Sequence, residues 1–501
     1  MMNLTDKPFE KLARGSYYLI LSNISNMTIG AIFWIILAKM VDPSVIGQTM
    51  VVIALATSVV GFAGYGVQVT ISKYISEYNA RNMQSTARKV LKLGLKIGLL
   101  VSVIAALCIV LLSGHLASVA YQNPSLSGLI IFAAITYIPS QTIVAALLGA
   151  FQGSHRMEYS FVISILYELL RLAIAIMLVI QGLDSFGIII GFSGASIIAS
   201  IVGYAYLIPR VIPRSKSNEE AESQNSLRHI VEFSGLNYFA VGMRTLSAQI
   251  GVLILGTQNF EWAAFYGLSV MIANIVGGIS LAVSRAILPT ASEEWAKGNK
   301  VKFRSVFNTA IRISLLLSGF AFMIFMIDPG YILRLLSEPY GEASNALRIL
   351  VVASIINAVG AIIISMLNAA NRAHVVARIG LLSSGSTIAL TFILAPAIGL
   401  EGAAVAILVG SLATLILSVT MLKIKEQVTI STKSAIKPII SISVGLLVGY
   451  SAYSLGVNVL VSLTFATISY VGFSLIYRVT TQTELKTLLS IVLRTKRSLD
   501  R

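Results

Sequence analysis

A small set of charged and polar side chains lies inside long apolar stretches of this sequence. Arg244 lies midway along one such stretch, with Asn237 two helical turns earlier on the same face and Gln249 further along. A guanidinium can donate two parallel hydrogen bonds to oxygen atoms, so Arg244 suits the binding of a phosphate or pyrophosphate. The structural alternative is an ion pair between Arg244 and a neighbouring helix.

Glu168 and Arg171 form the second candidate pair. They are three residues apart in the stretch LYELLRLAI and face the same way on a helix. In one interpretation their charges neutralise each other, which lowers the cost of burial in a membrane. In the other, Glu168 changes its charge as the protein moves and acts as a proton- or cation-sensitive switch. The sequence leaves both interpretations open.

Amide side chains in apolar stretches complete the candidate set. Asn23 and Asn26 share one helix face, and Gln68 has a similar environment. Such groups either hold neighbouring helices together or bind a hydroxyl-rich ligand. Cys108 is the only cysteine and the four histidines show no ligand spacing, so we expect no metal and no cofactor. We see no catalytic constellation and no phosphate-binding loop, and expect a protein that is not an enzyme.

The composition indicates that the elements carrying these residues span a membrane. Hydrophobic residues make up 56% of the 501-residue chain and charged residues 12%, with a mean hydropathy of +0.85. A soluble domain carries about 25% charged residues. A net charge of +16 would suggest nucleic acid in a soluble protein. Here an excess of cations on the cytoplasmic side explains it, and we expect membrane lipids and no nucleic acid as contacts.

An all-α polytopic membrane protein is therefore the predicted fold class. One span needs about 20 apolar residues, and the sequence offers about fourteen such transmembrane helices. The predicted spans are 16–38, 45–68, 91–112, 127–150, 159–180, 187–208, 234–256, 263–288, 306–327, 345–369, 376–396, 402–422, 437–455 and 458–477.

Charge in the connections predicts the orientation of the spans. Outside the spans, all basic residues except Lys39 and Arg334 fall on one side of the membrane, which the positive-inside rule assigns to the cytoplasm. Arg14 fits this ordinary pattern. We therefore expect a multi-pass protein of the cell membrane with both termini in the cytoplasm.

A hydrophilic break from Pro209 to Glu232 separates two apolar blocks that resemble each other. An offset of about 220 residues aligns them. The matches are Gly15 with Gly235, Tyr18 with Tyr238, Gly47 with Gly267, segment 76–82 with 292–299, and His155 with His374. Six spans in each copy make the copies parallel repeats. The predicted organisation is an N-terminal six-helix bundle (1–208), a cytoplasmic linker (209–232), a C-terminal six-helix bundle (233–432), two additional transmembrane helices (433–480) and a basic cytoplasmic tail (481–501).

Four segments have a family-like pattern: 36–47, 145–153, 366–372 and 399–406, the last with the sequence GLEGAAVA. They are similar to the first outward turn, the junction of helices four and five, its counterpart in the second half, and the G-x-x-G-A-A start of helix twelve. Together with the six-plus-six-plus-two plan, they resemble the polysaccharide-export branch of the multidrug/oligosaccharidyl-lipid/polysaccharide (MOP) transporter superfamily.

The resemblance implies a flippase for a polyprenyl-(pyro)phosphate-linked oligosaccharide, which crosses from the cytoplasmic to the outer leaflet by alternating access. Such transport serves surface polysaccharide or glycoconjugate assembly, with glycan-assembly enzymes as partners and H⁺ or Na⁺ as coupling ions. It implies a cationic cavity in which Arg244 holds the lipid phosphate and Arg14 lies at the entrance. The expected substrate-binding residues are Arg244, Asn237, Gln249, Asn23, Asn26, Gln68, Glu168, Arg171 and Arg14. The alternative is a cation-coupled exporter of small amphiphilic molecules.

Overall fold

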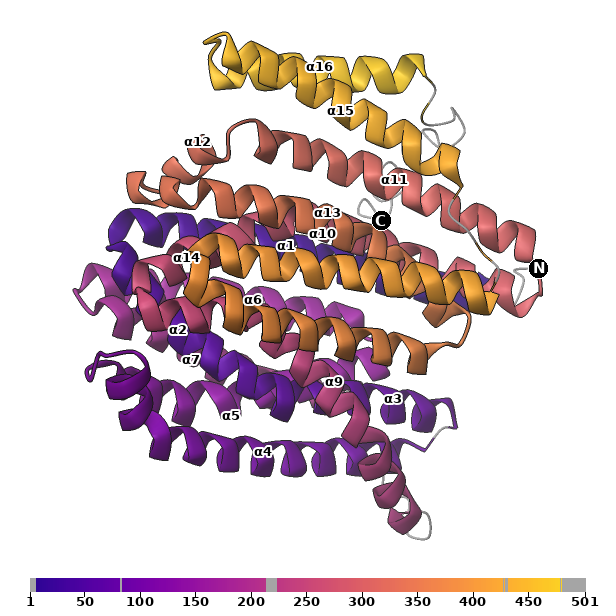
Figure 1. The fold of residues 1–501 in the computed structure, drawn as a ribbon. Coiled ribbons are helices and arrows are strands. Elements are labelled where there is room, and N and C mark those ends of the chain that lie inside the picture. The colour runs from indigo at the N-terminus through magenta and orange to yellow at the C-terminus, as the bar shows by residue number, and fades with distance from the viewer. Residues whose placement is uncertain are drawn as a thin grey trace. The chain divides into compact units, whose positions relative to one another are not determined.

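The computed structural model describes residues 6–81, 83–212, 223–426, 428, 431–477 and 479, and within these ranges it contains helices and no strand (Figure 1). The first half of the chain forms α1 (Asp6–Met40), α2 (Pro43–Val60), η1 (Gly61–Tyr65), α3 (Gly66–Ala80), α4 (Gln84–His115), η2 (Leu116–Ala120), α5 (Leu126–Gly153), α6 (Met157–Ile180), α7 (Asp184–Val202), η3 (Gly203–Leu207) and α8 (Ile208–Val211). The second half forms α9 (Ser223–Gln258), α10 (Phe260–Ala296), α11 (Lys300–Ile327), α12 (Pro329–Arg334), η4 (Glu338–Ala343), α13 (Ser344–Ala369), α14 (Ala373–Glu426), α15 (Thr432–Ser454) and α16 (Val459–Ile476).

Thirteen helical segments in the described residues are long and apolar enough to cross a membrane. One of them, Ala373–Ile424, has 52 residues and is interrupted at Ile398 and Gly399, whose backbone is not helical. Gly399 has a φ of +62°, which glycine adopts without steric cost. The predicted spans 376–396 and 402–422 lie on either side of this break. The predicted fold class, an all-α membrane protein of about fourteen spans, is confirmed.

The helices form two compact units, each built from several stretches of the chain. Unit 1 contains Met1–Ile272, Leu333–Leu350 and Ala377–Ala413. Unit 2 contains Ala273–Ile332, Val351–Val376 and Thr414–Arg501. This grouping places α9, the seventh predicted span, in unit 1. The predicted bundles 1–208 and 233–432 do not coincide with these units and stay a prediction, and the predicted tail 481–501 lies outside the described residues.

Small residues bring the helices of unit 1 into close contact. At Gly149 in α5, a Cβ atom would lie 2.5 Å from the carbonyl oxygen of Gln68 in α3. At Gly191 in α7, it would lie 2.7 Å from the Cβ of Ala175 in α6. Close approach of backbones is the usual way in which membrane helices associate, because lipid provides no hydrophobic driving force between them.

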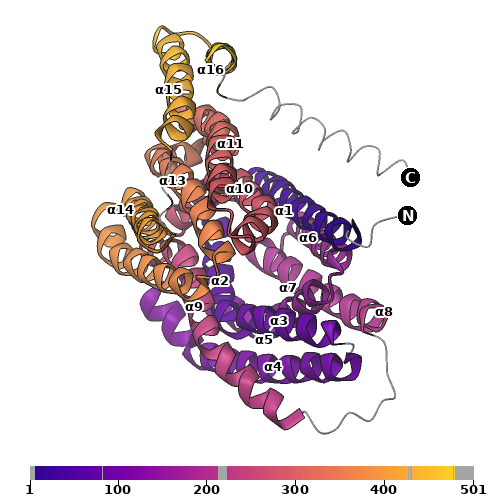
Figure 2. The same cartoon turned by 90° about the vertical axis from the view of Figure 1, so that its right-hand side faces the viewer.

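In unit 2, the C-terminal helix pair packs on α11. Ile442 of α15 and Tyr470 of α16 form a buried cluster with Met323 and Ile327 of α11. The hydroxyl of Tyr470 donates a hydrogen bond of 2.5 Å to the carbonyl oxygen of Leu316. Both views show α15 and α16 running along the same side of α11 (Figure 1, Figure 2).

Two pairs of corresponding turns support the internal duplication. After α3, Arg81 pairs with Glu77, and after α10, Lys297 pairs with Glu293, each as an i, i+4 ion pair. The backbone N–H of Asn299 donates to the carbonyl oxygen of Glu294. At the equivalent positions of the first copy, the N–H of Met83 donates to the carbonyl oxygen of Tyr78.

A second pair of turns shows the same correspondence. His155 and Asn371 both have positive φ, at 54° and 59°. In each turn the residue after the positive-φ residue is an arginine whose backbone N–H donates a hydrogen bond to a carbonyl oxygen at the end of the preceding helix. Arg156 donates to Phe151, and Arg372 donates to Leu367. All four turns fit one offset of about 216 residues, slightly shorter than the sequence indicated. The predicted match of His155 with His374 is therefore wrong by three positions.

Replacing Gly191 with alanine is expected to lower the apparent melting temperature, because the added methyl group meets Ala175 and overpacking costs about 1–3 kcal/mol. Gly194→Ala on the same helix is the control, since its nearest neighbour is the Cδ1 of Ile174 at 3.5 Å. Alanine favours helix over glycine by about 1 kcal/mol, so this control should be neutral or slightly stabilising. Thermal unfolding of the purified protein, followed by tryptophan fluorescence, measures both variants. Equal melting temperatures would contradict the close contact of α6 with α7.

Candidate functional site

Arg244 is held on the exposed side of α9. Around it, α9 packs on the π-helical turn η1: a Cβ at Gly242 would lie 2.1 Å from the ring of Phe62, and one at Gly61 would lie 2.6 Å from Thr245. The Arg244 side chain is exposed although its span, Phe239–Gln258, is apolar. Among the described residues none forms an ion pair, a hydrogen bond or a ring contact with its guanidinium. The predicted alternative of an ion pair with a neighbouring helix has no counterpart among these residues.

Of the other candidates on α9 and at the start of α1, only Gln249 has a described side chain. Gln249 is half-buried. Because a helix turns by about 100° per residue, Gln249 leaves α9 about 140° around the axis from Arg244, on a different face. Asn237 and Arg14 have helical backbones in α9 and α1, but their side chains lie outside the described residues. Their predicted roles stay predictions.

Glu168 and Arg171 form a buried ion pair on α6. The Nη2 of Arg171 lies 2.5 Å from the Oε2 of Glu168, and the two residues are 7% and 8% exposed. The contact is an ion pair without hydrogen-bond geometry, because Oε2 of Glu168 has no hydrogen-bond partner in the described structure. The Nε of Arg171 has no partner there either. The predicted contact is confirmed, and its possible function as a switch stays a prediction.

Aromatic rings enclose the guanidinium of Arg171. Its Cζ lies 4.3 Å from the ring centroid of Phe33 in α1 and 4.8 Å from that of Phe192 in α7. The faces of such rings are electronegative and stabilise a nearby cation by about 1–2 kcal/mol when water is excluded. Neither phenylalanine is recognisable from the sequence as a site residue, because the contacts with Arg171 join helices α1, α6 and α7, which no spacing rule connects.

Asn26 belongs to the same interface between α1 and α6. It lies one turn before Gly30 on the same face of α1, and a Cβ at Gly30 would lie 3.7 Å from the Nη2 of Arg171. The Oδ1 of Asn26 is buried without a hydrogen-bond partner in the described structure. A buried acceptor without a partner, one helical turn from the residue that faces Arg171, is suited to bind water or a small polar ligand. We name Asn26, Glu168, Arg171, Phe33 and Phe192 the arginine cluster.

Hydroxyl groups extend this polar region through unit 1. Tyr137 of α5 lies close to Thr57 of α2 and to Tyr167 of α6. Tyr167 also lies 5.8 Å, centroid to Cζ, from Arg171. Hydroxyl groups from α2, α5 and α6 therefore lie near one another inside unit 1. The sequence does not reveal this grouping, because the three residues belong to different helices and no spacing rule connects them.

The amide of Gln68 lies elsewhere, between α3 and α5. Gln68 in α3 donates a hydrogen bond of 3.4 Å to the side chain of Gln152 in α5, and its backbone packs on Gly149. This contact favours the interpretation of Gln68 as a residue that joins two helices. Asn23 is half-buried on α1.

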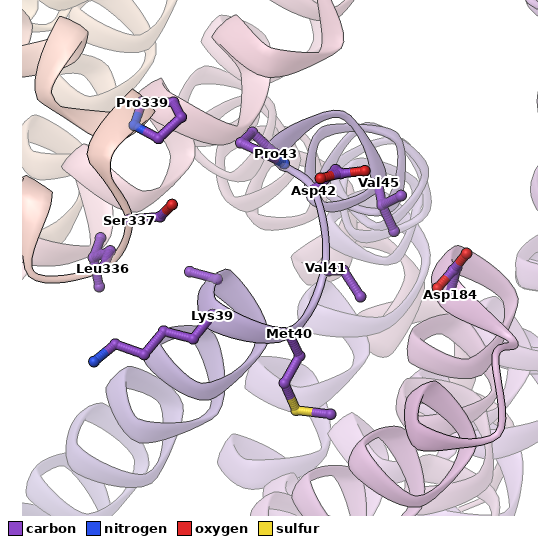
Figure 3. A pocket seen from close by; sticks show the side chains of 11 residues that line it. Lys39, Met40, Val41, Asp42, Pro43, Val45, Asp184, Leu336, Ser337 and Pro339 are labelled. Atoms are coloured by element: carbon purple, nitrogen blue, oxygen red, sulfur yellow. The ribbon is translucent and has the colours of Figure 1, made fainter.

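A pocket of about 520 Å³ lies at the turn between α1 and α2, where the chain is expected to face outward (Figure 3). Lys39, Asp42 and Asp184 supply its charges, and Ser337 a hydroxyl. Met40, Val41, Pro43, Val45, Leu336 and Pro339 supply most of the apolar lining. Figure 3 shows Lys39 beside Leu336 and Ser337, with Asp184 on the far side of the turn. None of the predicted site residues lines this pocket.

The charged groups in these spans offer places where a ligand could bind. The described residues contain no group of three or more histidine, cysteine, aspartate or glutamate side chains arranged for a metal ion. Arg244 offers an exposed cation inside an apolar span, and the arginine cluster offers a buried charge pair. Both are arrangements that mark substrate or ion pathways in membrane proteins.

Comparison with known proteins agrees with this description. The family described as "Polysaccharide biosynthesis protein" matches residues 12–295, and the MatE family matches residues 245–393. The uncharacterized membrane protein MJ1375 of Methanocaldococcus jannaschii is 21% identical over 429 residues, which cover 83% of this chain and 99% of that protein.

Two solved structures share the fold. The lipid II flippase MurJ, in an inward closed conformation, matches with a TM-score of 0.70 at 14% identity, over 93% of this chain and 99% of that one. An inward-facing multidrug resistance MATE family transporter of the MOP superfamily matches with a TM-score of 0.63 at 14% identity, over 85% and 98%.

The membrane-length helices define a multi-pass membrane protein, and its fold is the one seen in transporters of the MOP superfamily. Within that class, the chain belongs to the polysaccharide biosynthesis protein family, whose match covers more than half of its length.

Breaking the Glu168–Arg171 pair from either side is expected to destabilise the protein. Glu168→Met and Arg171→Met each leave one buried charge without its partner, at a cost of about 3–5 kcal/mol. The double variant removes both charges and should recover most of that loss. Arg156→Ala, which breaks the 3.1 Å pair of Arg156 with Glu158 at a largely exposed position, should cost less than about 1 kcal/mol.

Apparent melting temperatures of the purified variants test this cycle. Additive losses in the double variant would contradict a direct interaction between Glu168 and Arg171.

Proposed function

We propose that this protein is a flippase that moves a polyprenyl-(pyro)phosphate-linked oligosaccharide from the cytoplasmic to the outer leaflet, for surface polysaccharide or glycoconjugate assembly. The observation that carries the proposal is the exposed Arg244 within the apolar span Phe239–Gln258, in a chain of the polysaccharide biosynthesis protein family. The shared fold with the lipid II flippase MurJ supports transport of a lipid-linked substrate.

The role of Arg244 follows from the cost of moving an anion through hydrocarbon. A pyrophosphate loses its hydration shell in the membrane interior, and a buried unpaired charge is very unfavourable. A guanidinium replaces part of that shell with charge-assisted hydrogen bonds, and its planar fork matches two phosphate oxygens. Because Arg244 has no ion-pair partner among the described residues, it is available to a ligand.

Alternating access is the mechanism that we propose for the two predicted six-helix bundles, 1–208 and 233–432. The pyrophosphate and the glycan pass through a polar interior while the polyprenyl chain stays in the bilayer. The duplicated turns after α3 and α10 support a protein of two related halves, which is the usual basis of alternating access in secondary transporters.

The arginine cluster is a candidate for coupling to H⁺ or Na⁺. Protonation of Glu168, or binding of a cation at its carboxylate, would release Arg171 from its ion pair. The buried Oδ1 of Asn26, which has no hydrogen-bond partner in the described structure and lies one helical turn from Gly30, supports this role, because it offers an additional oxygen ligand. A coupled transporter needs a charge change of this kind in an element whose packing differs between its two states.

Export of small amphiphilic molecules is the second candidate function. It is favoured by the MatE match over residues 245–393 and by the shared fold with a multidrug resistance transporter. The aromatic rings around Arg171 fit a cationic or aromatic ligand as well as a structural role.

Deletion of the gene in its host separates the two functions. A flippase deletion should cause one intact lipid-linked oligosaccharide to accumulate on the cytoplasmic side, detected by mass spectrometry of the lipid extract with a leaflet-specific modification. If lipid-linked glycans are unchanged in a strain without a redundant flippase, and sensitivity to amphiphilic compounds rises, the exporter function replaces the proposal.

Arg244→Ala is expected to abolish most flipping with unchanged expression. Losing charge-assisted hydrogen bonds of about 1.5–3 kcal/mol lowers the affinity for the pyrophosphate group roughly 10- to 100-fold. Arg244→Lys keeps the charge and loses the fork, so it should recover activity only in part. Arg348→Ala is the matched control, because Arg348 is an exposed arginine that contacts Asn345 at the start of α13. Flipping into the outer leaflet of proteoliposomes, with lipid-linked oligosaccharide from the deletion strain, measures all three. Full activity of Arg244→Ala would remove the phosphate-binding role.

A further inference from the structure

The two copies of the repeat differ at one pair of equivalent helices: α11 is covered by other helices on its outward face, and α4 is not. Helices α4 and α11 follow the matched turns at Arg81 and Lys297, and the offset of about 216 residues continues along them. Their inward-facing positions are buried in both copies; the pairs are Leu91 with Phe307, Leu95 with Ile311, and Ser102 with Ser318. The two helices are therefore structural equivalents.

In unit 2, the C-terminal helix pair covers the opposite face of α11. Met323 and Ile327 are fully buried in the cluster with Tyr470 of α16. Gly319 lies so close to α15 that a Cβ atom there would be 2.3 Å from the Cδ1 of Ile442. This face of α11 is filled by protein.

In unit 1, the same face of α4 is uncovered. The equivalents of Gly319, Met323 and Ile327 are Val103, Leu107 and Leu111, and these three are 43%, 57% and 83% exposed. Leu100, one turn before Val103 on the same stripe, is 62% exposed. Helix α4 lies at the edge of unit 1 with α3 and α5 on one side of it (Figure 1, Figure 2). We name Leu100, Val103, Leu107 and Leu111 the α4 stripe.

Cations continue the α4 stripe at the end that is expected to face the cytoplasm. Lys92 and Lys96 are exposed, and α4 contains no acidic residue. At the position of Lys92, α11 has Asn308, whose Oδ1 accepts a hydrogen bond of 2.8 Å from the backbone of Ser431, just before α15. In unit 2 this position therefore holds the segment before α15 by a hydrogen bond, whereas in unit 1 the equivalent position is the cation Lys92.

We propose that the α4 stripe and its lysines bind an anionic phospholipid of the cytoplasmic leaflet. The lysines pair with the phosphate of the headgroup, and each such cation contributes roughly 1 kcal/mol of attraction to an anionic membrane surface. From Lys96 to Leu107 the helix rises about 16 Å, which matches half of a hydrocarbon layer about 30 Å thick. One acyl chain therefore reaches along Leu100, Val103 and Leu107.

The side chains of the α4 stripe favour a lipid over a protein helix. Helix contacts in membranes use small residues that let backbones approach, as Gly319 does in α11. Val103 stands at the equivalent position, and the neighbouring stripe residues are leucines. A flexible acyl chain adapts to this large, uneven surface, whereas a rigid helix would not approach it closely.

Lipid retention tests the headgroup contact. The full-length protein is purified from vesicles of equal parts dioleoyl phosphatidylglycerol and phosphatidylcholine, and the bound lipids are counted by native mass spectrometry. We expect preferential retention of phosphatidylglycerol, reduced roughly fivefold for each lysine removed in Lys92→Gln/Lys96→Gln. The control Lys300→Gln/Lys302→Gln removes two exposed cations from the equivalent end of α11 and should leave retention unchanged. Equal losses in both variants, or no preference in the wild type, would overturn the proposal.

The single cysteine reports on the position of the lipid chain. Cys108 is exposed on α4 beside Leu107, so a fluorophore attached there samples the α4 stripe. Phosphatidylglycerol with brominated chains should quench it more strongly than brominated phosphatidylcholine at the same mole fraction, and Lys92→Gln/Lys96→Gln should remove the difference. Equal quenching by the two lipids would refute binding at this face. Stronger displacement by a polyprenyl phosphate than by unlabelled phosphatidylglycerol would show that the site belongs to a different lipid.

Discussion

The membrane interior offers no water to the backbone, and this constraint decides the architecture. Each N–H and C=O group inside hydrocarbon must bond within its own helix, so the chain can cross only as long continuous helices. Interruptions then need a specific solution. Gly399 permits a sharp break with a φ of +62°, and the π-helical turn Gly61–Tyr65 keeps the segment from α2 to α3 helical while α9 packs closely on it. The same constraint makes every charge inside a span unfavourable unless it has a partner or a ligand.

The two charged features of unit 1 satisfy that requirement in opposite ways. Arg171 is neutralised by Glu168 and enclosed by Phe33 and Phe192, so its charge is balanced within the protein. Arg244 is exposed and has no partner among the described residues. Replacing an internal ion pair by apolar groups costs little, whereas removing one partner costs several kcal/mol. The charge of Arg171 is therefore tied to the packing of unit 1, whereas the charge of Arg244 is open to a ligand.

Sequence reasoning succeeded where the signal is local and failed where it is spatial. Span 159–180 was expected and α6 runs from Met157 to Ile180, because a run of apolar residues is itself the physical requirement for a span. The Glu168–Arg171 contact followed from helical spacing. The rings around Arg171 come from α1 and α7, and no spacing rule connects them with α6. The predicted match of His155 with His374 failed because only the backbone turns, with positive φ at His155 and Asn371, reveal the correct correspondence.

Duplication followed by divergence explains the difference between α4 and α11. Both helices have buried inward faces at matching positions, so both copies keep the contacts that a bundle needs. Their outward faces have different surroundings: α15 and α16 cover α11, whereas the outward face of α4 is exposed. Gly319 and Asn308 suit the close packing of α15 on α11. Gly319 leaves room for Ile442, and the side chain of Asn308 accepts a hydrogen bond from the backbone of Ser431. At the same positions Val103 and Lys92 fit a fluid layer of chains beneath charged headgroups. Because a side chain adapted to one neighbour is poorly suited to the other, moving α15 and α16 onto α4 would require new residues at these positions. When the two copies are aligned by their structures, the difference between the outward faces can be read from the residue types at equivalent positions of α4 and α11.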